Sequence, residues 1–291
     1  MTRYFQNKWR LYGWLAYAAL ILGLVASWIE GGSLCAPANH PVALPKNLAV
    51  ETATFPSASG ATISAWLVEG RTNRGVVILQ HGVRGDKSSL VARATFLSQA
   101  GYTVLLFDFQ AHGESRGDVI TFGYLESRDS QAAVDYVGKH FPGKPVAVIG
   151  VSLGAAAAVL ADPPLEVQAM VLEMMYPTIE EATKDRIEMR LGPPGRILSP
   201  LLTAQIPRRA GCEPKDLRPI VQVARITVPK LFLAGTADRD TKFSEAQKIF
   251  AAAAGPKAFM AFDGARHEDL FNFAPEQYQK AVLDFLDKNL K

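Results

Sequence analysis

The sequence predicts an α/β protein, with a mostly parallel sheet of eight strands flanked by helices, one inserted lid and an N-terminal membrane helix. From residue 48 to the end, short apolar β-rich runs alternate with helical patterns, which favours a parallel sheet. The later runs are almost wholly apolar, as expected for strands covered on both faces. Of the 291 residues, 48% are hydrophobic and only two are cysteine, which excludes a disordered chain and a disulfide-built scaffold.

Each expected element follows from its local pattern. The strands are expected at 48–55, 61–69, 75–80, 102–107, 145–149, 168–174, 230–234 and 257–262. The helices are expected at 88–99, 127–140, 153–161, 243–253 and 275–289. The first two strands have no helix between them, so they should form a β-hairpin, and the later strands should run parallel.

Residues 176–228 depart from this alternation. They contain no clear strand, and seven prolines interrupt any long helix: Pro177, Pro193, Pro194, Pro200, Pro207, Pro214 and Pro219. The segment is too long for an ordinary connection, so we expect an inserted lid over a binding site. The alternative is a structural excursion that packs against the sheet.

The N-terminal segment has the length and composition of a membrane helix. Nineteen uncharged residues lie between Arg10 and Glu30, and at about 1.5 Å per residue they nearly cross a hydrocarbon core of about 30 Å. Trp9, Trp14 and Trp28 lie near the ends, where such rings favour the interface. We expect an uncleaved anchor. The alternative is a signal peptide cleaved near Ala36-Pro37-Ala38, after which the protein would be secreted.

The charges predict the orientation of this anchor. Arg3, Lys8 and Arg10 precede the span and no further Lys or Arg follows until Lys46, so the N-terminus should stay cytoplasmic and the rest should lie on the periplasmic or extracellular side. The remaining chain is neutral, with 28 basic and 28 acidic residues, so a nucleic-acid partner is not expected.

The expected domains are therefore a tail and anchor at 1–30, a Gly- and Pro-rich linker at 31–47 and an α/β domain at 48–291. Cys35 and Cys212 match no metal-site spacing. They could pair in an oxidising compartment, or they could be two unrelated buried thiols.

A candidate nucleophile follows one of the predicted strands. Gly150-Val151-Ser152-Leu153-Gly154 matches G-x-S-x-G, with an apolar run before it and a small-residue helix after it. This is the context of a nucleophile elbow, a sharp turn that exposes the serine. The glycines are needed because the turn leaves no room for side chains.

A serine nucleophile needs a base and an acid that orients the base. His267 is the best placed histidine, in a polar loop after the last predicted strand, and Asp238 follows a buried strand at the carboxyl edge of the sheet. Asp240 is the near competitor for the acid, and Glu173 is a more distant one. His40 belongs to the linker, and His140 ends an amphipathic helix.

The order Ser152, Asp238, His267 resembles that of the α/β-hydrolase superfamily, and the resemblance spans about residues 48–291. Gln80-His81-Gly82-Val83-Arg84-Gly85 is similar to the family's HG loop. Phe107 to Ser115 resembles its D-x-R-G-H-G-x-S segment, with Gln110-Ala111 in place of Arg-Gly. The nearest branch is the serine-aminopeptidase-like and monoacylglycerol-lipase-like one.

The resemblance implies roles for further residues. The backbone N–H groups of Val83 and Leu153 would form the oxyanion hole, and His81 and His112 would be structural. No metal and no organic cofactor are implied.

The expected function is a serine hydrolase that cleaves a carboxylic ester of a small acyl substrate through an acyl-enzyme. An aminopeptidase, a thioesterase and an acyltransferase use the same triad, and Glu180, Glu181 and Glu188 would suit an aminopeptidase that binds a free amino terminus. A non-catalytic, membrane-tethered binding module is the alternative from another class.

Overall fold

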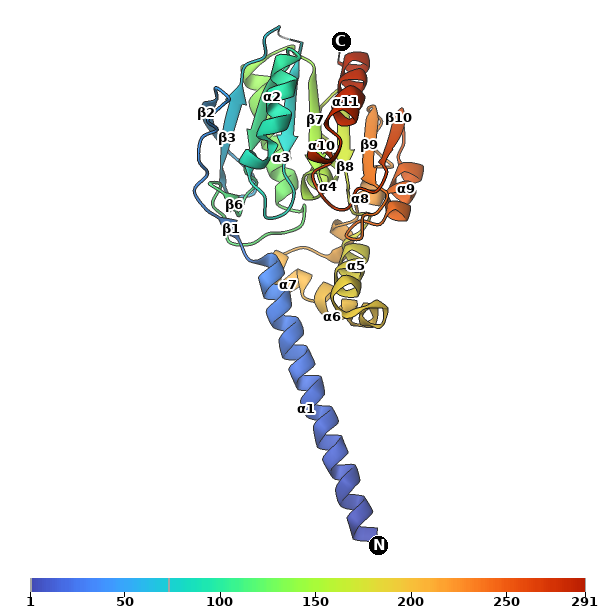
Figure 1. Ribbon diagram of the computed structural model, residues 1–291. Coiled ribbons are helices and arrows are strands. Elements are labelled where there is room, and N and C mark those ends of the chain that lie inside the picture. Colours follow the sequence, from blue (N-terminus) through green and yellow to red (C-terminus); the bar gives the residue numbers. More distant parts are fainter. Residues whose placement is uncertain (1, 73, 291) are drawn as a thin grey trace.

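The computed structural model describes residues 2–72 and 74–290. Its main sheet has eight strands in the order β10-β9-β8-β7-β4-β5-β3-β2 (Figure 1). The strands are β2 (Glu51–Pro56), β3 (Thr62–Val68), β4 (Val76–Gln80), β5 (Thr103–Phe107), β7 (Val146–Val151), β8 (Ala169–Glu173), β9 (Lys230–Gly235) and β10 (Lys257–Phe262). Strand β3 pairs antiparallel with β2 and β5, and the remaining pairs are parallel. The predicted mostly parallel sheet is confirmed.

Helices cover both faces of the sheet (Figure 1). One face packs against η1 (Lys87–Leu90), α2 (Val91–Gln99), α10 (Leu270–Phe273) and α11 (Pro275–Asn289). The other packs against α3 (Glu126–His140), α4 (Leu153–Leu160) and α9 (Phe243–Ala252). On β4, Val76 and Ile78 enter one core and Val77 and Leu79 the other. This alternation explains the wholly apolar strands, since both faces are buried.

Residues 176–228 form a helical insertion between β8 and β9, which we call the insertion. It contains α5 (Ile179–Leu191), η2 (Pro193–Leu198), α6 (Ser199–Thr203), α7 (Ile206–Ala210), η3 (Pro214–Asp216) and α8 (Pro219–Gln222). Five of these elements begin with a proline at the first or second position, where the missing N–H costs nothing. The prolines thus divide the insertion into short helices.

Helix α1 runs from Thr2 to Cys35 and projects away from the body, with its C-terminal end beside α6 and α7 (Figure 1). Its segment Tyr12–Cys35 is long and apolar enough to cross a membrane, with a mean hydropathy of 1.6. Exposed apolar side chains such as Trp14 and Leu22 line it. The segment is a candidate membrane anchor or signal sequence. The helix ends at Cys35, so the first residues of the predicted linker are helical.

After α1, the chain returns to the body as β1 (Ala38–Asn39), which pairs parallel with β6 (His112–Gly113). Cys35 and Cys212 are both buried and are not joined by a disulfide.

Candidate functional site

Ser152 lies at the sharp turn between β7 and α4. Its backbone adopts φ 50° and ψ −106°, a conformation rare for residues other than glycine. A side chain on Gly150 would put its Cβ 2.5 Å from the nitrogen of Ala155, and one on Gly154 would put its Cβ 2.4 Å from the carbonyl oxygen of Gln80. Both contacts involve backbone, which cannot move aside. The two glycines therefore permit the turn that presents Ser152.

His267 and Asp238 join Ser152 in one hydrogen-bonded line. His267 Nε2 lies 3.2 Å from Ser152 Oγ, and His267 Nδ1 lies 2.7 Å from Asp238 Oδ2. The two residues follow β10 and β9, so they meet Ser152 at the carboxyl edge of the sheet. The bond to Asp238 places the Nδ1 proton toward the carboxylate and leaves Nε2 free to accept a proton from Ser152.

The contacts of the loop after β9 distinguish the two candidate acids, Asp238 and Asp240. The Asp238 side chain is 1% exposed, and its Oδ1 accepts hydrogen bonds from the backbone nitrogens of Asp240 (2.8 Å) and Thr241 (2.9 Å). Asp240 turns instead to Arg186 of the insertion, with 3.1 Å between Oδ1 and Nη1. Asp238 is thus the residue that holds His267.

Thr241 is a residue that the sequence interpretation missed. Its hydroxyl lies 3.0 Å from His267 Nδ1 and 3.3 Å from Asp238 Oδ2, and it donates to the carbonyl oxygen of Met174 at 3.1 Å. The sequence feature that could have indicated Thr241 is its position three residues after the candidate acid Asp238.

Asp238, Asp240 and His267 also offer ligand atoms within 4.8 Å of one another. His267 and Arg186 already bind the carboxylates there, so the arrangement gives no independent support for a metal.

Glu173, the more distant candidate acid, belongs to a separate buried cluster. Its carboxylate is buried and binds Arg93 at 2.9 Å, and it accepts a hydrogen bond from Tyr278. Arg93 also binds Asp269, so this cluster ties α2, β8 and the loop before α10 together. Burial and the Glu173 charge raise the pKa of Tyr278 well above its ordinary value. Glu173 therefore supports the fold and does not reach His267.

The HG loop after β4 lies against Ser152. A Cβ on Gly82 would be 3.7 Å from Ser152 Cβ, so Val83 follows directly beside the serine. Leu153 is the first residue of α4, where backbone N–H groups lack partners within the helix. Both residues line the same cavity as Ser152. These positions are where an oxyanion hole is expected.

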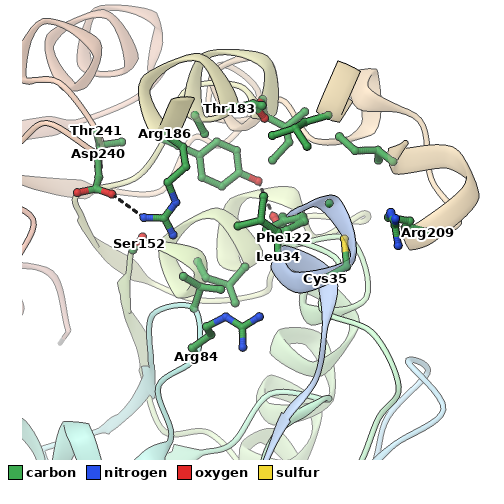
Figure 2. A pocket seen from close by; sticks show the side chains of 18 of the residues that line it. Leu34, Cys35, Arg84, Phe122, Ser152, Thr183, Arg186, Arg209, Asp240 and Thr241 are labelled. Atoms are coloured by element: carbon green, nitrogen blue, oxygen red, sulfur yellow. Dashed lines mark hydrogen bonds and ion pairs between the residues drawn. The ribbon is translucent and has the colours of Figure 1, made fainter. Parts of the chain in front are cut away.

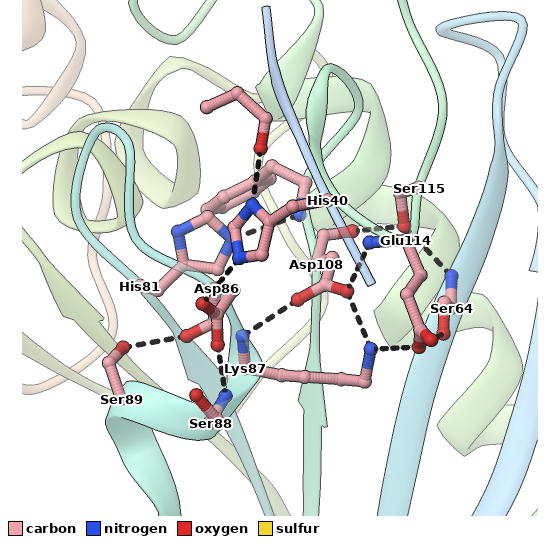
Figure 3. A network of polar contacts seen from close by, with 12 residues as sticks. His40, Ser64, His81, Asp86, Lys87, Ser88, Ser89, Asp108, Glu114 and Ser115 are labelled. Atoms are coloured by element: carbon pink, nitrogen blue, oxygen red, sulfur yellow. Dashed lines mark hydrogen bonds and ion pairs between the residues drawn. The ribbon is translucent and has the colours of Figure 1, made fainter. Parts of the chain in front are cut away.

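A buried polar network supports the HG loop (Figure 3). Asp108 accepts from Lys87 Nζ (2.6 Å), from the Lys87 backbone nitrogen (2.7 Å) and from that of Glu114 (2.9 Å). Burial raises the pKa of Asp108, although these bonds oppose the shift. Lys87 also binds Glu114 at 2.7 Å. The segment that resembles D-x-R-G-H-G-x-S thus fixes the end of the loop.

Two of the remaining histidines are buried beside this loop. His81 donates from Nδ1 to the Gly82 carbonyl oxygen (2.8 Å) and accepts from the Phe109 nitrogen at Nε2 (3.1 Å). Burial lowers its pKa to about 3, and it also lowers that of His112, whose ring lies 5.1 Å away. Both histidines therefore stay neutral at physiological pH.

The last two histidines, His40 and His140, make contacts away from Ser152. His40 binds Asp86 at 3.0 Å, and His140 stacks on Tyr136.

Ser152 and His267 open into a cavity of about 210 Å³ (Figure 2). Its walls come from the HG loop, the insertion and, at the end of α1, Gly31, Leu34 and Cys35. Most of the wall is apolar and includes Leu34, Val83, Phe122, Leu153, Ile179, Ala182, Leu202 and Ile206. Arg84, Arg186 and Arg209 also line it. Among the described residues of the wall, Asp240 is the only carboxylate, and it is paired with Arg186.

Comparisons with known proteins agree with this architecture. Residues 71–209 match the family model described as "Serine aminopeptidase, S33". The chain is 23% identical to the uncharacterized protein YqkD of Bacillus subtilis over 237 residues, 80% of this chain and 78% of YqkD. It is 26% identical to human monoglyceride lipase over 230 residues, 67% of this chain and 76% of the lipase. The esterase Pf2001 of Pyrococcus furiosus superposes with a TM-score of 0.71 at 21% identity, over 88% of this chain and 100% of that one.

The fold is that of the α/β hydrolases, and the family match and these relatives make the chain similar to proteins of that superfamily. Within the superfamily it is similar to the serine-aminopeptidase-like and monoacylglycerol-lipase-like branch, as the HG loop and the residue order predicted.

Proposed function

We propose that the protein is a serine hydrolase in which Ser152 is the nucleophile, His267 the general base and acid, and Asp238 the residue that orients His267. The observation that carries this proposal is the continuous line from Asp238 Oδ2 through both nitrogens of His267 to Ser152 Oγ, at 2.7 and 3.2 Å. A catalytically silent binding module would not need this arrangement.

The reaction follows from these contacts. His267 Nε2 takes the proton of Ser152 as Oγ attacks the acyl carbonyl carbon. The N–H groups of Val83 and Leu153 stabilise the negative oxygen that develops, and losing one such donor costs about 3 kcal/mol of transition-state stabilisation. His267 then returns the proton to the leaving group as its bond to the acyl carbon breaks. Water attacks the acyl-enzyme by the same steps in reverse and releases the acid.

The walls of the cavity favour an apolar acyl ester over a peptide with a free amino terminus. The three acids that would suit an aminopeptidase bind cations elsewhere: Glu180 binds Arg218, Glu181 lies near Lys248, and Glu188 binds Lys242. None of them lines the cavity, where an ammonium group would meet three arginines. The insertion acts in this proposal as the lid over the acyl pocket.

A fluorophosphonate probe tests the mechanism. The wild type should label, and Ser152→Ala and His267→Ala should each reduce the labelling rate by about 10³-fold or more, because they act as one unit. Ser244→Ala, at an exposed serine on α9, is the matched control. Labelling of Ser152→Ala at the wild-type rate would remove the proposed nucleophile.

A profile of p-nitrophenyl esters against aminoacyl p-nitroanilides then identifies the bond. We expect the esters to be preferred. Preference for the aminoacyl amides would support the aminopeptidase.

We further propose that α1 is retained as a membrane anchor, with the N-terminus in the cytoplasm and the catalytic domain on the other side. Arg3, Lys8 and Arg10 before the span support this orientation. Retention is supported by Gly31, Leu34 and Cys35, since cleavage after Ala38 would remove part of the cavity wall.

A further inference from the structure

The C-terminal end of α1 forms part of the wall of the candidate active site. Leu34 and Cys35 belong to the wall of the cavity that contains Ser152, on the side opposite the loop that holds Asp240 (Figure 2). A membrane tether alone would need no contact with the pocket. The position of these residues therefore calls for a role beyond attachment.

Contacts of three residues, Ser27, Trp28 and Glu30, fix the last turns of α1 to the insertion. Glu30 forms an ion pair with Arg190, and the Ser27 carbonyl oxygen and hydroxyl each accept from Gln205 Nε2 at 3.1 Å. The Arg209 guanidinium donates to the Trp28 carbonyl oxygen and lies 4.0 Å from the Trp28 ring centroid. The helix is thus held at a defined position relative to the pocket.

Gly31 marks how closely the two parts pack. A Cβ at this position would lie 2.3 Å from Gln205 Oε1. Gln205 is itself buried and bonded to Ser27 and Arg209, so it is not free to move away. A larger residue at position 31 would push α1 off the insertion.

The same end of α1 binds the HG loop. Arg84 donates to the carbonyl oxygens of Ser33 and Ala36, which lie at or just beyond the C-terminus of the helix. Carbonyl groups at a helix C-terminus lack partners within the helix and carry partial negative charge, so a guanidinium is a favourable cap. Arg84 has φ 60° and is the neighbour of Val83. The cap therefore holds the strained loop that carries one expected oxyanion donor.

We propose that the last turn of α1 is a part of the substrate site: Leu34 and Cys35 form a wall of the subsite for an apolar acyl chain, and the helix end, through Arg84, positions the HG loop. This inference rests on the proposed serine hydrolase. The helix upstream of Ser27 should act only as a span, so its sequence should not affect the reaction.

Acyl-chain selectivity tests the wall. Leu34→Trp in the full-length protein in detergent should lower kcat/KM for p-nitrophenyl decanoate at least about tenfold and leave the acetate within about twofold, because the indole fills the far part of the subsite. Leu22→Trp, an exposed position in the span, is the matched control and should leave the whole profile unchanged.

Two outcomes distinguish a failure of the proposed acyl subsite from a failure of the proposed serine hydrolase. If Leu34→Trp labels normally with fluorophosphonate but keeps the wild-type chain-length profile, Leu34 does not form a wall of the acyl subsite. The proposed serine hydrolase activity is then unaffected. If the wild type does not label, the hydrolase itself fails.

The positioning role of Arg84 has a different readout. Arg84→Met should lower kcat for the short acetate ester about tenfold with little change in KM, since a displaced oxyanion donor acts mainly in the transition state. Arg84→Lys, which keeps a donor, should recover part of the loss. Arg74→Met removes an exposed arginine paired with Asp287 far from the site and should leave kcat unchanged. A wild-type kcat in Arg84→Met would overturn this half of the proposal.

Discussion

Asp238 and Asp240 are two positions apart, yet their surroundings give them different tasks. Asp238 is enclosed and accepts two backbone N–H groups together with His267, whereas the Asp240 side chain is 34% exposed and faces Arg186. Backbone donors that converge on one carboxylate fix its direction as well as its charge. Sequence spacing alone could name the pair, but only these contacts distinguish its members.

We expect Asp238→Asn to reduce kcat/KM for an ester by about 10⁴-fold, because the amide would stabilise the wrong tautomer of His267. Asp240→Asn should cost less than about tenfold, since it loses only an exposed ion pair. Steady-state kinetics on both variants, with matched circular dichroism spectra, make the comparison. The reverse order would assign the orienting role to Asp240.

Thr241 adds a second fixing point for the same imidazole. Thr241→Val keeps the shape of the side chain but removes its hydrogen bonds, so we expect kcat to fall about tenfold. Thr241→Ser retains the hydroxyl and should stay within about threefold of the wild type. Equal losses in the two variants would indicate that the methyl group, and not the hydroxyl, is important.

At the scale of elements, the HG loop is stabilised by neutral, buried histidines and by a buried ion pair. The pKa of His81 falls to about 3 because burial disfavours its charged form. In the unfolded chain the pKa returns to about 6.5. The unfolded state therefore binds more protons than the folded state between these pH values. The contribution of His81 to the free energy of unfolding is fully present above pH 6.5 and is lost as the pH falls toward 3.

From this one group, the free energy of unfolding should decrease by about 1.4 kcal/mol per pH unit between pH 6 and pH 4. His81→Gln should show a shallower loss over this range, although it will be less stable at neutral pH. His140→Gln, at an exposed histidine, is the control and should keep the wild-type slope. Denaturant unfolding at several pH values measures the slopes, and identical slopes for His81→Gln and wild type would contradict the assignment.

The elements themselves were largely predictable. All eight predicted strands of the main sheet appear. The inner strands β4, β5, β7, β8 and β9 are buried on both faces and give unbroken apolar runs, whereas the edge strands β2 and β10 are partly exposed and were recognised as β-rich runs between turn residues. The insertion was recognised from its prolines, but its short helices were not, since the order of such helices depends on tertiary packing more than on propensity. The end of α1 was also misplaced, because Gly31 and Gly32 suggested a linker where the insertion holds them in a helix.

The site was predictable to a similar degree. Ser152, Asp238 and His267 lie together as the motif and loop positions indicated. Thr241, Arg84 and the α1 residues of the cavity were not found, because each contributes through contacts between segments far apart in the chain. Local patterns carry no record of such contacts.

At the scale of the whole molecule, sidedness decides which substrates the site can meet. In spheroplasts of a bacterial expression host, protease added outside should degrade the catalytic domain of the full-length protein, while a cytoplasmic marker stays intact. The mass of the purified protein should include residues 1–38. Protection of the domain from outside protease would reverse the orientation, and a mature N-terminus at Asn39 would show that α1 is cleaved.

Helix α1 is 34 residues long and continuous, which makes it a rod of about 50 Å with its upper end fixed to the body. A helix adapts to bilayers of different thickness by changing its tilt, commonly by about 20°. Because the contacts of Ser27, Trp28 and Glu30 leave no hinge at the junction, the body should turn together with the rod. With α1 retained as the proposed anchor, lipid composition would set the height and angle at which the cavity mouth meets the bilayer surface, and membrane thickness would become a means of controlling access to Ser152.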